Sequence, residues 1–154
     1  MNVTINLDEQ ANPKYYKLWD QSNELMEKLN EVATDLKKFK YPKFFSRSAA
    51  KRLDEQGQKL IRSEPAFIKW RDAAIDFCLR PEYVFNRDEP QATAFLHYTL
   101  KLNSRVDQLD RYVNFASNLY QIIKSDLRSI QNNSRYIIST LLAIVALALA
   151  IIAL

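Results

Sequence analysis

The residue types that most often catalyse reactions or bind metals are scarce in this chain of 154 residues. His97 is the only histidine and Cys78 the only cysteine, so the sequence holds neither a cluster of histidine ligands nor a Cys-x-x-Cys pair. Gly57 is the only glycine, which excludes a glycine-rich phosphate-binding loop. We therefore predict a protein that is not an enzyme and that binds neither a cofactor nor a metal.

Acidic residues recur along one part of the chain, at Glu24, Glu27 and Glu31. A carboxylate metal site in a helical bundle also uses Glu-x-x-His partners, which this sequence lacks. We interpret the three glutamates as a charged outer face. Cys78 lies on an apolar arc, which is typical of a small core residue. A single cysteine also excludes an internal disulfide and fits a reducing compartment.

The strongest charge asymmetry lies between residues 37 and 52. This segment contains no acid and seven cations, which are Lys37, Lys38, Lys40, Lys43, Arg47, Lys51 and Arg52. Four aromatic residues are interleaved with them, namely Phe39, Tyr41, Phe44 and Phe45. One interpretation is a solvated turn whose rings face inward. Others are binding to anionic lipid headgroups, to nucleic acid, or to the chain's own acidic first helix.

The composition predicts an all-α helical bundle, because glycine occurs once and the Asn-Gly signal of a β-hairpin is absent. We expect residues 1–11 to form a flexible arm. Asn12 before Pro13 predicts a helix start, and Pro42 ends that helix near Lys40. Its core-facing positions step by three and four, and they are Tyr15, Leu18, Ser22, Leu25, Leu29, Val32, Leu36 and Phe39.

Prolines divide the middle of the chain. We predict one helix over residues 46–62 and, with Ser63 as its cap before Pro65, a second over residues 63–79. A linker is expected over residues 80–90. Gly57 has two interpretations, because a glycine in a helix either lets another element approach closely or breaks the helix.

From Pro90 to the last residue nothing stops a helix, so we predict a long, heptad-patterned stalk. Its apolar seam steps by four and three through Phe95, Thr99, Leu102, Val106, Leu109, Val113, Ala116, Tyr120, Ile123, Leu127, Ile130, Ser134 and Ile137. Such a seam is typical of a coiled coil, so Leu102, Val106, Leu109 and Val113 are predicted oligomerisation residues. A wider apolar face between residues 112 and 123 indicates packing on the other helices as a bundle.

The last nineteen residues, 136–154, carry no charge, and we predict that they form a transmembrane helix. Lys124, Arg128 and Arg135 precede this stretch against only Asp126, so the positive-inside tendency predicts a single-pass tail anchor whose N-terminal domain, residues 12–135, is cytoplasmic.

Small residues form one face of the same stretch and complete the set of predicted oligomerisation residues. They are Ser139, Ala143, Ala146, Ala150 and Ala153, spaced by four and three. The sequence therefore predicts a membrane-anchored, homo-oligomeric helical scaffold or tether with a lipid bilayer as a partner. A pore-forming effector is the alternative, and a membrane-held nucleic-acid-binding module is a weaker one.

Overall fold

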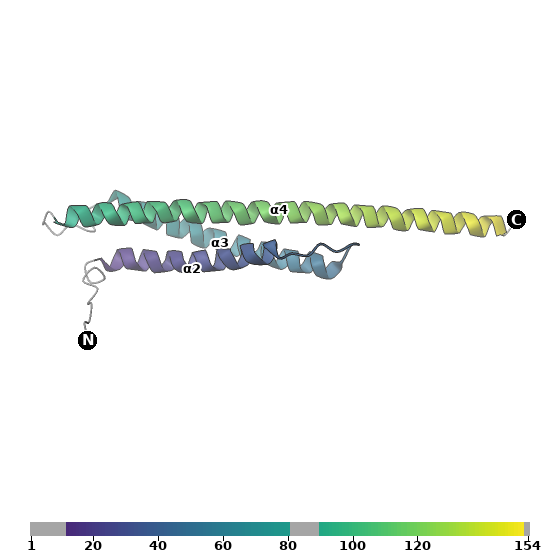
Figure 1. Ribbon diagram of the computed structural model, residues 1–154, viewed down its shortest axis with the longest axis horizontal. Helices are drawn as coiled ribbons and strands as arrows, with labels where there is room; N and C mark the ends of the chain where they lie inside the picture. Colours follow the sequence, from purple (N-terminus) through teal and green to yellow (C-terminus); the bar gives the residue numbers. More distant parts are fainter. Residues whose placement is uncertain (1–11, 81–89, 153–154) are drawn as a thin grey trace, which may run out of the picture.

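The computed structural model describes residues 12–80 and 90–152, with side chains over 12–80 and 95–148. Its elements are three helices: α2 (Pro13–Lys37), α3 (Arg47–Leu79) and α4 (Pro90–Ile152). Figure 1 shows α2 and α3 lying along the first part of α4, with α3 running in the opposite direction to the other two. All three pairs of helices are in contact. The predicted all-α helical bundle is thus confirmed for the described residues; the predicted arm over 1–11 and residues 81–89 of the linker lie outside them.

Helix α2 follows the predicted pattern closely. The Asn12 side chain accepts a hydrogen bond of 3.1 Å from the backbone N–H of Tyr15, which caps the helix just before Pro13. Every predicted core position from Tyr15 to Leu36 is buried, while Phe39 is half-buried. The helix ends at Lys37, three residues earlier than predicted, and Lys38 closes it with backbone bonds to Thr34 and Leu36.

Helix α3 corrects the prediction of two separate helices, because it continues through Pro65. Proline cannot donate the backbone bond that the carbonyl of Ile61 would accept. Both Pro65 and Ile61 are exposed, so water can solvate that carbonyl. Ser63 does not cap a new helix; its hydroxyl donates to the carbonyl of Lys59 at 2.9 Å, one turn back in the same helix.

Gly57 marks a close approach between α3 and α4. It is buried, and a β-carbon at this position would lie 2.6 Å from the hydroxyl oxygen of Tyr120 and 2.7 Å from two of its ring carbons. These distances are shorter than van der Waals contact, so the Tyr120 ring occupies the space that any other residue would need. Of the two interpretations of Gly57, the structure therefore supports close approach, and α3 is unbroken there.

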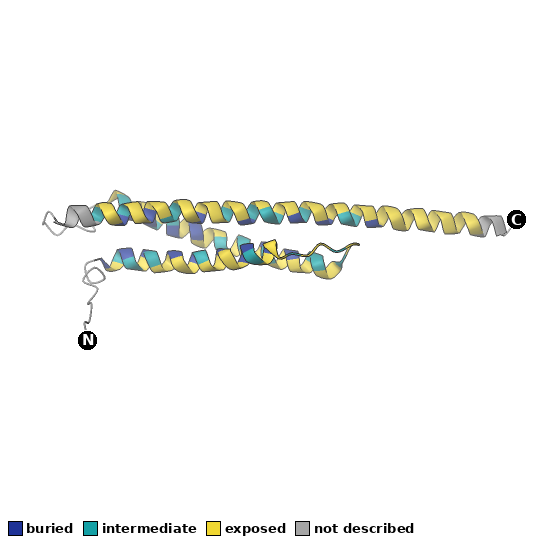
Figure 2. Cartoon of the chain, in the orientation of Figure 1, coloured by how far each residue is buried: buried dark blue, intermediate teal, exposed yellow. Residues whose placement is uncertain are grey.

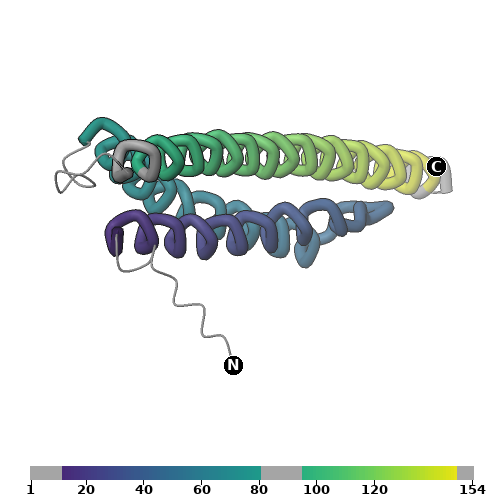
Figure 3. Tube along the Cα trace, turned by 60° about the vertical axis from the view of Figure 1, so that its left-hand side comes forward, coloured from purple at the N-terminus to yellow at the C-terminus, as the bar shows by residue number. Residues whose placement is uncertain are grey.

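The core consists of two clusters that share the seam of α4. In the first, the buried rings of Tyr15 and Tyr98 stack with centroids 4.3 Å apart, and burial raises the pKa of Tyr15 to about 12. The second lies nearer the end of α2 and joins Val32 and Leu36 to Ile123 and Leu127. Figure 3 shows the three helices side by side over this length.

The seam of α4 changes environment along the helix. From Phe95 to Ser134 every seam residue is buried or half-buried, and Ile137 is the first that is exposed. Figure 2 shows the same change, because α4 continues beyond the other helices as a stretch coloured almost entirely as exposed. We call residues 136–148, whose side chains are all exposed, the extension.

The structure contradicts the predicted transmembrane anchor. Within residues 12–80 and 90–152, no helix was found to hold an apolar stretch long enough to cross a membrane. The side chains of residues 149–154, the last part of the predicted anchor, lie outside the described part. The single-pass assignment is therefore corrected, and the cytoplasmic orientation deduced from it loses its basis.

Candidate functional site

The two residues with the greatest chemical reactivity, His97 and Cys78, lie at the same end of the bundle. His97 is exposed near the start of α4. Cys78 is half-buried, its sulfur lies 4.0 Å from the carbonyl oxygen of Thr99, and burial raises the pKa of its thiol. A raised thiol pKa lowers the thiolate fraction, which makes Cys78 a poor nucleophile. In the described ranges, no three His, Cys, Asp or Glu residues are grouped as a metal site.

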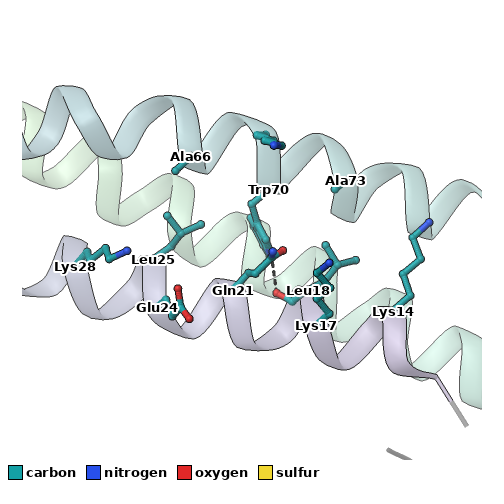
Figure 4. A pocket seen from close by; sticks show the side chains of 11 residues that line it. Lys14, Lys17, Leu18, Gln21, Glu24, Leu25, Lys28, Ala66, Trp70 and Ala73 are labelled. Atoms are coloured by element: carbon teal, nitrogen blue, oxygen red, sulfur yellow. Dashed lines mark hydrogen bonds between the residues drawn. The ribbon is translucent and has the colours of Figure 1, made fainter. Parts of the chain in front are cut away.

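A groove of about 520 Å³ runs between α2 and α3. Figure 4 shows Trp70 reaching across from α3, where its indole N–H donates to the carbonyl of Leu18 at 2.7 Å. Glu24 lines this groove together with the lysines Lys14, Lys17, Lys28 and Lys69. Glu31 lies outside it and forms an ion pair of 2.8 Å with Lys59. The acidic residues therefore do not converge on one point, and the groove is a wide surface with solvated charges.

The seven predicted cations lie at the opposite end of the bundle from His97. They span the end of α2, the connection over residues 38–46 and the first turns of α3, and all seven are exposed. The Lys37 ammonium nitrogen lies 5.1 Å from the centroid of the Phe115 ring, so the ring stabilises the ammonium group by a cation–π contact. Among the acidic side chains that the structure describes, none lies within 4.0 Å of any of the seven.

The connection between α2 and α3 is fastened to α4 at a single seam position. The Ser134 hydroxyl accepts a hydrogen bond of 3.1 Å from the backbone N–H of Phe45 and donates one of 2.8 Å to the carbonyl of Ile130. Nearby, burial and a hydrogen bond to Asp126 raise the pKa of Tyr41. The hydrogen bonds of Ser134 explain why the apolar seam contains a polar residue at this position. Ser134 holds the connection against α4 where the bundle ends.

A pocket of about 430 Å³ lies on the extension side of this fastening. Apolar side chains from both elements line it: Phe44 and Phe45 from the connection, and Ile137, Ile138 and Leu141 from the extension. Phe44 is 64% exposed. Arg135 is also part of the lining, and Arg128 lines a smaller pocket behind Phe45. Cations, aromatic rings and aliphatic side chains therefore meet where α4 leaves the bundle.

The extension exposes large apolar side chains in succession. They are Ile137, Ile138, Leu141, Leu142, Ile144, Val145 and Leu147, between 45% and 64% exposed. Residues at successive positions of a helix point in directions about 100° apart, so this apolar surface surrounds the helix and is not confined to one stripe. Keeping each such side chain in water instead of burying it costs roughly 1.5–3 kcal/mol. Among the described residues, the extension holds the longest succession of exposed large apolar side chains.

The predicted oligomerisation residues divide into two groups. Leu102 and Leu109 are fully buried inside the bundle, and Val106 and Val113 pack against the same cluster. The bundle therefore occupies this part of the seam within one protomer, which leaves Leu102 and Leu109 no surface for a second copy.

The second group lies on the extension. Ser139, Ala143 and Ala146 are exposed there, whereas the side chains of Ala150 and Ala153 lie outside the described part. Among the predicted residues whose side chains are described, Ser139, Ala143 and Ala146 are thus the ones exposed to a second copy.

Ser134, Arg128 and Arg135 were not predicted from the sequence as parts of a site. The signals were present, since Ser134 is a polar residue within an apolar seam and the two arginines are the last two charged residues before the uncharged stretch. What could not be seen was that residues 38–46 return to this point of α4, because 89 positions separate Phe45 from Ser134.

No protein-family model matches the chain, and no curated protein or solved structure does so either.

Proposed function

We propose that this protein is a non-catalytic, homo-oligomeric helical scaffold whose copies associate through the extension of α4. The observation that carries the proposal is the ring of exposed apolar side chains from Ile137 to Leu147. A second copy of the same segment supplies a matching apolar surface with no charge to desolvate, which fits self-association.

The small residues of the extension support the same arrangement. Ser139, Ala143 and Ala146 lie on one face, where the absence of bulky side chains allows a second helix to approach closely. The large aliphatic side chains beside this face then interdigitate with those of the partner. The bundle stays outside this contact, because its own seam is filled by α2 and α3.

The experiment measures the mass of the full chain by light scattering in a mild detergent. We expect a defined oligomer, and we expect the double variant Leu141→Glu, Ile144→Glu to be a monomer because two charges would be buried at the contact. Leu100→Glu is the matched control, since Leu100 is 60% exposed on the bundle part of the same helix. A monomeric wild-type chain would overturn the proposal.

Cross-linking locates the contact. In a Cys78→Ser background, Ala143→Cys should give a disulfide-linked dimer under mild oxidation, whereas Ser104→Cys, exposed on the bundle part of α4, should not. Ala146→Leu combined with Ala150→Leu should weaken the oligomer by preventing close approach of the helices. Equal cross-linking at both positions would show random collision and would contradict the proposed contact.

A pore-forming effector stays the alternative prediction: release of dye from liposomes by the full chain would favour it, whereas retention would favour the scaffold.

A further inference from the structure

We propose that the end of the bundle docks on an anionic lipid surface through a collar of basic and aromatic residues, without any segment crossing that surface. The collar comprises Lys38, Lys40, Lys43, Phe44, Phe45, Arg47, Arg128 and Arg135. This inference adds the connection between α2 and α3 to the surface described above. It shares Ile137, Ile138 and Leu141 with the proposed oligomer contact, so the two proposals are tested by different measurements.

Charge complementarity is the first argument. The cations of the collar are exposed and form no ion pair with an acidic side chain in the described part of the chain. Three of them follow the end of α2 within six residues, and Arg47 begins α3. Such a group of uncompensated cations attracts a negatively charged surface, and the attraction falls as salt concentration rises.

The position of the rings is the second argument. Phe44 and Phe45 are both exposed, and they share one apolar pocket with Ile137, Ile138 and Leu141. Aromatic side chains beside cations are typical of segments that lie at the boundary between headgroups and acyl chains. The backbone bond from Phe45 to Ser134 holds the two rings at the base of the extension, so the rings and the cations reach the same surface together.

The same features favour lipid over nucleic acid. Aromatic rings and cations would also suit stacked bases and phosphates. The aliphatic side chains of Ile137, Ile138 and Leu141 offer no hydrogen bond to a base or a sugar, yet they are three of the eight residues that line the pocket. An acyl chain entering between headgroups fits that lining, whereas a nucleotide does not.

The test is co-sedimentation of the full chain with vesicles of phosphatidylcholine alone or with about a third of phosphatidylserine, at low and high salt. We expect preferential binding to the anionic vesicles. Changing Lys38, Lys40, Lys43 and Arg47 to Gln should weaken that binding at least about tenfold and reduce its salt dependence, because each such cation contributes roughly a factor of five.

The matched control removes the same charge elsewhere, with Lys17, Lys28, Lys69 and Lys101, all exposed, changed to Gln. This variant should bind nearly as the wild type does. Phe44→Ser with Phe45→Ser should weaken binding while leaving the salt dependence intact, which separates the contribution of the rings from that of the charges.

Several outcomes would overturn the proposal: no binding, equal binding to neutral vesicles, equal losses in the two lysine variants, or release from vesicles by a single-stranded oligonucleotide that binds more tightly. The light-scattering mass tests the oligomer proposal, and vesicle binding tests the docking proposal, so the failure of one is distinguishable from the failure of the other. Folding of each variant is checked by the helical circular dichroism signal.

Discussion

The bundle part of α4 and its extension are two stretches of one helix that differ in what covers them. Between Phe95 and Ser134 the seam is enclosed by α2 and α3, and the outer face mixes polar side chains with single exposed apolar ones such as Leu100 and Ile122. Beyond Ser134 the apolar side chains surround the helix and the described residues leave them uncovered. An apolar seam can be buried by one neighbouring face, whereas an apolar surface on all sides requires a covering around the whole helix. The following substitutions test this comparison.

The largest effect should come from shortening a buried leucine. Leu109→Ala should lower the free energy of unfolding by about 3 kcal/mol, because it leaves a cavity at a fully buried position. Leu142→Ala in the extension should change it by less than about 0.5 kcal/mol at concentrations below association. Urea unfolding followed by circular dichroism gives both values, and equal losses would refute the distinction between the two stretches.

The next effect concerns the hydrogen bond that joins α3 to α2. Trp70→Phe removes the donor to the carbonyl of Leu18 and should cost about 1–2 kcal/mol. Trp19→Phe is the matched control because Trp19 is only half-buried and lies under Arg105, 4.5 Å from the ring centroid. Its cost should be smaller. Fluorescence of the two single-tryptophan proteins provides a second readout, with Trp70 emitting at the shorter wavelength; the opposite order would contradict the described burial.

The hydrogen bond from the Phe45 backbone to Ser134 lies where the bundle part of α4 meets the extension. Removing this bond should have a local effect. Ser134→Ala deprives the N–H of Phe45 of its partner and should cost about 1 kcal/mol. Hydrogen exchange at the Phe45 amide should accelerate, while the amides of the core positions of α2 keep their rates. Ser129→Ala on the exposed face of α4 is the control, and unchanged exchange at Phe45 would show that the bond does not form in solution.

The smallest effect tests how closely α3 approaches α4. In a Tyr120→Leu background, Gly57→Ala should stabilise the chain by up to about 1 kcal/mol through helix propensity. In the wild-type background the Tyr120 ring must move aside, which should cancel much of that gain. Thermal unfolding of the four proteins of this double-mutant cycle measures the difference. An identical gain in both backgrounds would mean that the ring does not lie over Gly57.

Local patterns predicted much of the fold. The cap at Asn12 and the stripe of α2 both follow from side-chain chemistry and helical spacing, and the seam of α4 followed the same rule as far as Ser134. The prediction that a helix ends before Pro65 was wrong. The free-energy cost of a proline within a helix depends on whether water can solvate the carbonyl that loses its backbone hydrogen bond, here that of Ile61. That exposure is a property of the tertiary structure. The coiled-coil interpretation of Leu102 and Leu109 had a similar origin, since a seam does not record whether its partner is another chain or the same one.

The candidate site was less predictable. The basic segment was recognisable from charge alone, but its proximity to Arg135 depends on the path of the chain between α2 and α3. The apolar stretch after Arg135 was interpreted as a membrane span from its length in the sequence, whereas no helix of the described residues was found to be long and apolar enough to cross a membrane. Sequence periodicity therefore indicated what each helix would bury, and not where its ends would meet.

The continuity of α4 makes it a spacer of defined length. Its 63 residues correspond to about 95 Å at the usual helical rise. If two copies pair in the same direction along their extensions, the bundles lie side by side and present a doubled basic surface. If they pair in opposite directions, the bundles lie at the two ends of a rod and bring two separate surfaces to a fixed distance. The polarity of one short helical contact thus decides whether the assembly concentrates a surface or bridges two, and fluorescence energy transfer between labels placed on the two bundles distinguishes these geometries.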